Sequence, residues 1–121
     1  MSQSVLVVDD DHDIQHLIKM ILVPPAYEVT SAENGAAALE QFLTGATPDI
    51  LLLDLMMPNM TGYTLLNQLY ERGLHSSVAI VVMSADVLTR QQIIKLGVKG
   101  FLTKPFNVSD LEHMLKQLSH S

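Results

Sequence analysis

Three short runs of consecutive apolar residues set the strongest limit on how this chain can fold. They read SVLVV at 4–8, ILLL at 50–53 and VAIVVM at 78–83, and none of them alternates with polar residues. A strand with one face in water alternates apolar and polar side chains, whereas a strand covered on both faces is apolar throughout. We therefore expect a sheet whose central strands are buried between two layers of helices.

Segments with helical spacing of apolar residues separate these runs. Helices are predicted at 12–22, from Asn34 onward, from near Gly62, over about 87–96 and at the end of the chain. Two further strands are predicted at 27–32 and 100–103. The helix over 87–96 has a weak apolar pattern, which favours a loosely held element. Strands that alternate with helices in this way predict a mostly parallel sheet, with helices on both faces and all 121 residues in one domain.

Composition excludes several classes of protein. The chain has 13 acidic and 7 basic residues, a net charge of −6, whereas a general nucleic-acid surface needs clustered Lys and Arg. It has no cysteine, so neither a disulfide framework nor a Cys-based metal site is possible. The sequence has neither the pattern of a signal peptide nor an apolar run as long as a membrane span, so we expect a cytoplasmic protein.

Among the methionines, we expect Met20, Met83 and Met114 in the core.

Charged and polar side chains stand where the predicted strands end. Asp9 and Asp10 follow the first strand, Asp54 the third, Ser84 the fourth and Lys104 the fifth. The carboxyl ends of parallel strands lie along one edge of the sheet, and ligands of open α/β sheets bind at that edge. The sequence therefore predicts that three carboxylates, a hydroxyl and an ammonium group converge there.

Helix capping is the alternative explanation for any one of these acidic residues, and Asp11 or Asp13 could cap the first helix. Capping does not explain three carboxylates together, because like charges at close range repel unless a cation joins them. Oxygen ligands without His or Cys suit a hard cation, Mg²⁺ or Mn²⁺. Beside such an ion, Asp54 could act as a nucleophile toward phosphorus, with Lys104 and Ser84 contacting the transferred group.

The motifs VLVVDDD, LLLDLMMPNMTG, VVMSA and GFLTKPF, in this order, resemble the receiver (CheY-like) domains of bacterial two-component response regulators. The resemblance extends from about Val5 to Leu118. It implies a doubly wound (βα)5 flavodoxin-like three-layer sandwich with a parallel sheet of order 2-1-3-4-5. It also implies one receiver domain over residues 1–121, which is not an enzyme beyond self-catalysed phosphoryl transfer and slow autodephosphorylation.

The resemblance further implies roles for individual residues at the phosphorylation site. Asp54 is expected to be the phosphoacceptor and Lys104 the phosphate-binding lysine. Asp10 is expected to bind Mg²⁺ directly, and Asp9 through water. The backbone carbonyl of Met56 would complete the protein ligands together with Asp54. In the loop that follows, Pro58 is expected to fix the backbone.

The domain is expected to signal through a conformational switch that follows phosphorylation. By the same resemblance, Ser84 is the switch hydroxyl, Phe101 the switch aromatic, and the peptide bond between Lys104 and Pro105 is cis. The surface made by the fourth helix, fifth strand and fifth helix would change on phosphorylation. The implied partners are a histidine kinase or phosphotransfer protein and a downstream output domain or target. Direct binding of nucleic acid or membrane by this domain is not expected.

Three alternatives remain beside this interpretation. A phosphatase of the haloacid-dehalogenase type also uses an Asp nucleophile, but it needs a second Asp at the position held here by Met56. A nucleotide or flavin binder needs a Gly- or Ser/Thr-rich phosphate loop where this chain has DDDHD. A pseudo-receiver that acts as a binding module without phosphorylation usually lacks one of the acidic residues or the lysine, and this chain has all of them.

Overall fold

The structure is a computed structural model that describes residues 2–45, 47–57, 61–86 and 90–119. The strands are β1 (Gln3–Val8), β2 (Tyr27–Ala32), β3 (Ile50–Asp54), β4 (Ala79–Ser84) and β5 (Gly100–Thr103). The α-helices are α1 (His12–Ile21), α2 (Gly35–Thr44), α3 (Gly62–Glu71), α4 (Arg90–Leu96) and α5 (Val108–Ser119), and a short 3-10 helix, η1, spans Leu74–Ser77.

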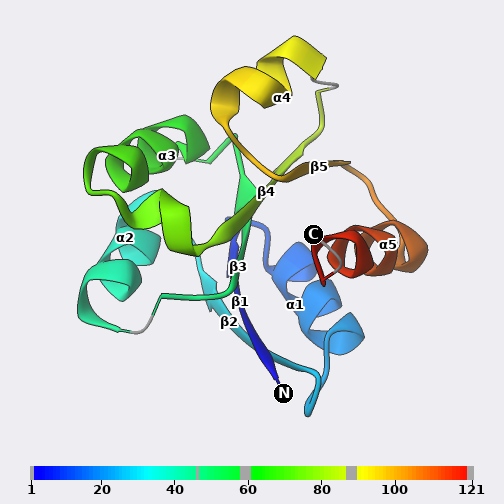
Figure 1. Cartoon of the computed structure of the whole chain (residues 1–121). Helices are drawn as coiled ribbons and strands as arrows, with labels where there is room; N and C mark the ends of the chain where they lie inside the picture. The colour runs from blue at the N-terminus through cyan, green and yellow to red at the C-terminus, as the bar shows by residue number, and fades with distance from the viewer. Residues whose placement is uncertain (1, 46, 58–60, 87–89, 120–121) are drawn as a thin grey trace.

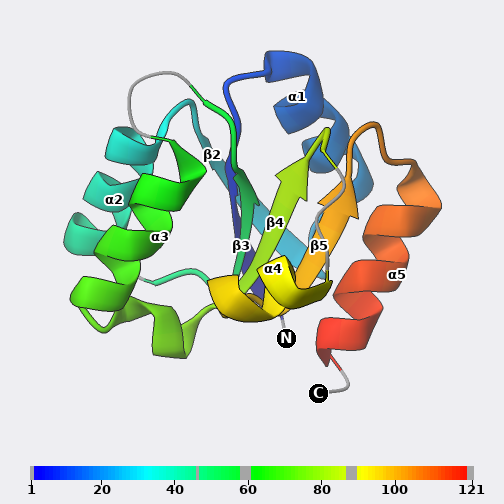
Figure 2. The same cartoon turned by 90° about the horizontal axis from the view of Figure 1, so that it is seen from above.

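The five strands form one parallel sheet in the order β2-β1-β3-β4-β5. Helices α2 and α3 cover one face of this sheet, and α1 and α5 cover the other (Figures 1 and 2). The predicted fold class, a doubly wound flavodoxin-like sandwich with strand order 2-1-3-4-5, is therefore confirmed. Strand order reverses beside β1, which places a ligand site at the carboxyl ends of β1 and β3.

The continuous apolar runs are explained by a core on each side of the sheet. In β3, Leu51 and Leu53 pack with α2 and α3, while Ile50 and Leu52 pack with α1 and α5. Successive side chains of a strand point to opposite faces, so a strand buried on both faces needs apolar residues at every position. Burial of each such side chain contributes roughly 2 kcal/mol to folding.

Side-chain caps begin helices α1, α2 and α3, and a fourth begins α5. The Asp11 carboxylate accepts the Asp13 N–H at 2.9 Å at the start of α1. The Asn34 side chain accepts the Ala37 N–H at 2.8 Å at the start of α2, as predicted. Thr61 caps α3 in the same way. The capping interpretation is therefore right for Asp11, and Asp13 supplies the N–H that this cap satisfies.

The prediction that Met20 lies in the core is wrong, because its side chain is 66 % exposed. The buried face of α1 passes through Gln15, Ile18 and Leu22, and Met20 points away from that face. Met83 is buried and Met114 half-buried, as expected. Pro58 and the predicted start of the fourth helix at 87–89 lie outside the described residues.

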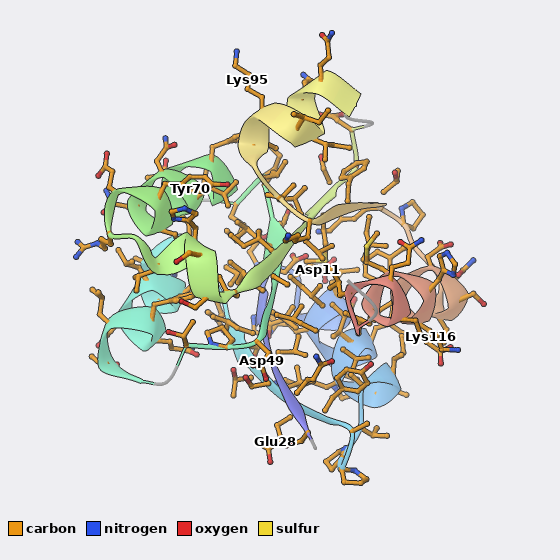
Figure 3. All side chains as sticks on the ribbon, in the orientation of Figure 1. Asp11, Glu28, Asp49, Tyr70, Lys95 and Lys116 are labelled. Carbon is orange, nitrogen blue, oxygen red and sulfur yellow. The ribbon has the colours of Figure 1, made fainter. Side chains whose placement is uncertain are left out.

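Lys95 and Lys116 in Figure 3 point away from the body of the molecule. Within the described ranges, no helix is both long enough and apolar enough to cross a membrane.

Candidate functional site

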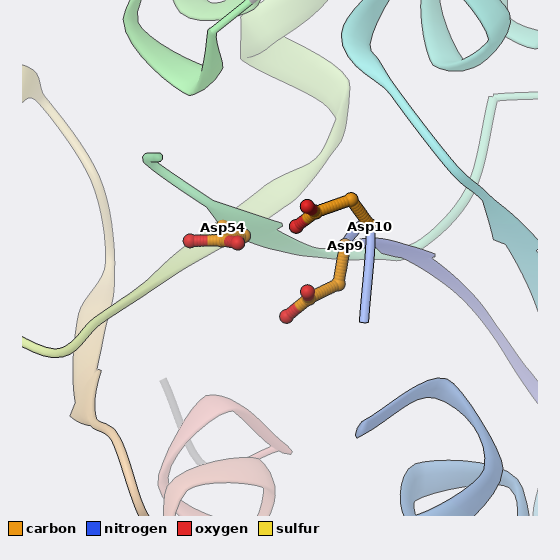
Figure 4. A group of neighbouring side chains, drawn as sticks. All are labelled: Asp9, Asp10 and Asp54. Atoms are coloured by element: carbon orange, nitrogen blue, oxygen red, sulfur yellow. The ribbon is translucent and has the colours of Figure 1, made fainter. Parts of the chain in front are cut away.

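Three carboxylates meet at the carboxyl ends of β1 and β3. Strands β1 and β3 pair in register up to Val8 and Leu53, so the next residues, Asp9 and Asp54, emerge side by side. One ligand oxygen from each of Asp9, Asp10 and Asp54 lies within 4.8 Å of the others. Figure 4 shows the three side chains as neighbours. Asp9 and Asp54 are buried, at 0 % and 4 % exposed, whereas Asp10 is open to solvent.

Among the described residues, Lys104 is the only positively charged one that forms an ion pair with these buried carboxylates. Its Nζ lies 2.6 Å from Asp9 Oδ2 and 3.3 Å from Asp54 Oδ2. Its backbone N–H donates to the Ser84 carbonyl at 2.8 Å, which continues the pairing of β4 with β5 beyond Thr103. The peptide bond from Lys104 to Pro105 is cis, as the resemblance implied. The ends of β1, β3 and β5 therefore converge, as predicted.

The electrostatics of this cluster favour a further cation. Burial raises the pKa of Asp9, and the nearby Lys104 and the Asp11 N–H only partly offset that rise. For Lys104, burial acts to lower the pKa, but the pairing with Asp9 and Asp54 outweighs it, so the pKa is raised. Three carboxylates share one ammonium group here, so the cluster retains excess negative charge.

Backbone donors hold one oxygen of each buried carboxylate. The Asp11 N–H donates to Asp9 Oδ1 at 2.9 Å, and the Met56 N–H donates to Asp54 Oδ1 at 3.1 Å. The second oxygen of each carboxylate faces Lys104. The Met56 side chain is exposed, and the contact of this residue with Asp54 is made by its backbone N–H.

Ser84 and Phe101 occupy the neighbouring strands β4 and β5. Ser84 ends β4, is 3 % exposed, and its Oγ accepts the Asp86 N–H at 3.1 Å. Phe101 is half-buried, pairs with Val82 of β4 and packs against the core on the α2–α3 side. Ser84 thus lies on β4, next to the strand that carries Asp54, and Phe101 lies one strand further away, on β5.

The donor set fits a divalent cation. It consists of carboxylate oxygens from Asp9, Asp10 and Asp54, with neither His nor Cys in the cluster. Hard divalent cations prefer such oxygen ligands, and one exposed ligand leaves room for water on the ion. The cluster can therefore bind a divalent metal ion.

Two contacts at the site were not predicted from the sequence. Gln15 is buried and donates a hydrogen bond to the backbone carbonyl of Asp9. The Asp86 N–H is bound to Ser84. A signal for Gln15 was present, because it lies three and seven positions before Ile18 and Leu22 and so is a polar residue on the apolar face of α1. For Asp86, only the spacing to Ser84 could have suggested a turn.

Comparison with known proteins identifies relatives along most of the chain. The family model described as the response regulator receiver domain matches residues 5–116. The transcriptional regulatory protein KdpE of Staphylococcus aureus is 33 % identical over 118 residues, which cover 96 % of this chain and 49 % of KdpE. The DNA-binding transcriptional regulator NtrC of Escherichia coli is 34 % identical over 119 residues, 96 % of this chain and 25 % of NtrC. The chain thus spans about half of KdpE and a quarter of NtrC.

Solved structures have the same architecture. The chemotaxis protein CheY4 of Vibrio cholerae superposes with a TM-score of 0.85 at 27 % identity, over 97 % of this chain and 98 % of that one. The response regulator TrrA of Thermotoga maritima, solved in complex with Mg²⁺-BeF, has a TM-score of 0.81 at 29 % identity, over 96 % and 98 %.

Proposed function

The chain belongs to the response regulator receiver domain family, and on that premise we propose that it carries a phosphoryl group on Asp54. A receiver domain is the phosphorylated input module of a two-component system. The observation that carries the proposal is the environment of Asp54, a buried carboxylate 3.3 Å from Lys104 in a cluster with Asp9 and Asp10. A nucleophilic carboxylate and a cation for the incoming phosphate oxygens are thereby placed together.

The proposed reaction is a transfer from a phosphohistidine. An oxygen of Asp54 attacks phosphorus, the bond between phosphorus and the imidazole nitrogen breaks, and the leaving imidazole takes up a proton. Lys104 balances the negative charge on the phosphoryl oxygens during transfer. Ser84 ends the adjacent strand, from which its hydroxyl can donate to the phosphorylated residue. Beyond this self-catalysed transfer and slow hydrolysis, we assign the domain no enzymatic activity.

Asp9, Asp10, Asp54 and the Met56 carbonyl would hold the metal ion, which we propose to be Mg²⁺ or Mn²⁺. When bound, the ion neutralises charge on the phosphoryl group and orients it toward Asp54. Asp9 and Asp54 are pre-positioned by the N–H groups of Asp11 and Met56. The TrrA structure in complex with Mg²⁺-BeF supports this assignment by analogy.

The proposed output is a shift in population toward an active arrangement. Ser84 would move toward the phosphoryl group and Phe101 would turn inward, which changes the surface formed by α4, β5 and α5. Phe101 is half-buried beside the core, which is consistent with a side chain that can turn further inward. The partners on this model are a histidine kinase or phosphotransfer protein and an output domain or target.

We further propose that residues 1–121 form one receiver domain that acts in the cytoplasm. Both cores share the single sheet, which supports one cooperative unit. Direct contact with nucleic acid or membrane is not part of this proposal.

The test is the intact mass of the protein after incubation with acetyl phosphate, with and without Mg²⁺, beside the variant Asp54→Asn. We expect one added phosphoryl group, about 80 Da, that requires both the metal and Asp54. No addition under any condition, together with no binding of beryllofluoride, would instead favour a pseudo-receiver that works without phosphorylation.

A further inference from the structure

Gln15 is a buried polar residue that the proposed reaction does not use. Among the described residues, four polar or charged side chains are buried, namely Asp9, Asp54, Ser84 and Gln15. The first three belong to the proposed phosphorylation site. Gln15 is 7 % exposed and lies on the apolar face of α1. A buried amide is costly unless it is hydrogen-bonded, so its partners indicate why it is there.

Both partners of the Gln15 amide are backbone carbonyls at the carboxyl ends of β1 and β2. Nε2 donates to the Asp9 carbonyl at 2.6 Å and to the Ala32 carbonyl at 3.4 Å. The Asp9 N–H donates to the same Ala32 carbonyl at 3.2 Å. Gln15 therefore bridges α1 to the two strand ends, and Asp9 is held through both its N–H and its carbonyl.

The hydrogen bond from Gln15 to the Asp9 carbonyl also restrains the orientation of Asp10. The carbonyl of residue 9 and the N–H of Asp10 belong to one rigid peptide plane, so fixing the oxygen fixes the direction in which Asp10 leaves the strand. Three carboxylates whose oxygens lie within 4.8 Å repel one another. Without a restraint, rotation of this peptide would relieve the repulsion by moving Asp10 away from Asp9 and Asp54.

We propose that Gln15 is a positioning residue for the metal site, which holds the Asp9–Asp10 peptide so that both carboxylates face Asp54. The inference rests on the proposed function, because it assumes that the acidic cluster binds a divalent cation. Outer partners that orient metal ligands typically change metal affinity 10- to 100-fold when they are removed. Loss of the Gln15 amide should therefore weaken metal binding while leaving the ligands themselves in place.

The chain offers a matched control on the opposite face of the sheet. The amide of Gln41, on α2, donates to the carbonyl of Ser31 at 3.2 Å. Ser31 directly precedes Ala32 in β2, so Gln41 and Gln15 tie consecutive carbonyls of one strand to two different helices. Of the two side chains, only Gln15 also bonds to the peptide group between Asp9 and Asp10. Gln41→Met thus removes the same type of bond without touching the metal site.

The experiment measures the affinity of the whole chain for Mn²⁺ by electron paramagnetic resonance of the free ion. The variants are Gln15→Met, Gln15→Asn and Gln41→Met. Thermal unfolding of each confirms that it is folded at the measurement temperature. We expect Mn²⁺ binding to weaken roughly 10-fold in both Gln15 variants and by less than about 2-fold in Gln41→Met. Phosphorylation by acetyl phosphate should then need more Mg²⁺ but reach the same rate at saturation.

The outcomes separate the inference from the function on which it rests. If the unaltered chain binds no Mn²⁺, the proposed function fails. If the unaltered chain binds Mn²⁺ and the Gln15 variants bind it equally well, the inference is overturned. The same holds if the Gln15 variants lose no more Mn²⁺ affinity than Gln41→Met does, because Gln15 is then a structural residue. A saturated phosphorylation rate that falls while Mn²⁺ affinity stays constant would also overturn it.

Discussion

At the scale of single residues, the charge of Asp9 governs how stability depends on pH. Burial raises the pKa of Asp9, so the folded chain binds more protons than the unfolded chain between the unfolded pKa, about 3.9, and the higher folded value. Without metal, stability should therefore decrease as the pH rises through this window. Asp9→Asn removes the charge, so the variant should be more stable than the unaltered chain above the window, as measured by thermal unfolding in EDTA.

The control for this prediction is Glu28→Gln, because Glu28 is an exposed carboxylate on the edge strand β2 and points outward in Figure 3. The same loss of charge at Glu28, which lies outside the acidic cluster, should not reproduce the stabilisation expected of Asp9→Asn. Parallel pH profiles for Asp9→Asn and the unaltered chain would contradict the prediction.

Gly62, at the start of α3, lies against the backbone at the end of β3, the strand that carries Asp54. A Cβ at this position would lie 2.4 Å from the carbonyl oxygen of Asp54 and 2.6 Å from Cα of Leu55. Both atoms belong to the backbone, so they cannot rotate away. Gly62→Ala should therefore destabilise the fold by about 2 kcal/mol or more in urea unfolding, and it should slow phosphorylation because Asp54 is displaced.

Gly73→Ala is the control for Gly62→Ala, because it should lower the stability of the fold without displacing Asp54. Gly73 has φ of 70°, which alanine adopts at a cost of about 1 kcal/mol, yet an added Cβ would meet nothing within 4 Å. It should lower stability with an unchanged rate of phosphorylation. Equal rates in Gly62→Ala and Gly73→Ala would show that the contact of Gly62 with β3 does not matter for Asp54.

At the level of elements, α4 is anchored at its carboxyl end by a side chain of α3. None of its described side chains, at 91–96, is buried. The Tyr70 hydroxyl of α3 donates to the Leu96 carbonyl at the end of α4. The next residue, Gly97, has φ of 70°, and a Cβ there would meet the same hydroxyl. The weak apolar pattern of this segment thus agrees with the lack of a buried side chain at 91–96, and the half-buried Tyr70 contacts the end of the helix.

Tyr70→Phe should loosen α4 selectively. Loss of one hydrogen bond costs about 1 kcal/mol, and the amides of α4 should exchange with deuterium several-fold faster than in the unaltered chain. Tyr63→Phe is the control, since Tyr63 lies on the same helix with its side chain 43 % exposed. Unchanged exchange in α4 of Tyr70→Phe, or an equal change in Tyr63→Phe, would refute the role of this bond.

At the scale of the whole molecule, metal binding and folding stability are linked. A cation that binds only the folded chain adds about 2.7 kcal/mol at a concentration 100 times its Kd, which corresponds to a rise in Tm of about 10 °C for a domain of this size. Mg²⁺ should produce this rise because it relieves repulsion among Asp9, Asp10 and Asp54. Differential scanning calorimetry at matched ionic strength measures it, with NaCl as the control salt. A Tm independent of Mg²⁺ would contradict a preformed metal site.

The order of the elements and the kinds of side chain at the ends of the strands could be predicted from the sequence. Periodicity is a local property, so the apolar runs identify buried strands and their polar ends identify one edge of a parallel sheet. The convergence of Asp9, Asp54 and Lys104 followed from that topology alone and is confirmed by the ion pairs. The chemistry proposed for Asp54, Lys104 and Ser84 was inferred from the residue types, whereas the roles of Met56 and Phe101 came from the resemblance, and all of these roles remain predictions.

Which polar groups meet, and which helix faces are buried, depends on how the elements pack in the folded chain. The bond from Gln15 to the Asp9 carbonyl, the bond from Tyr70 to Leu96 and the exposure of Met20 each depend on how one helix sits against distant segments. Helical spacing defines a face but not its partner, because the partner is selected by packing among elements far apart in the chain. The acidic cluster was therefore visible in the sequence, whereas the groups that hold it in position became visible only in the folded chain.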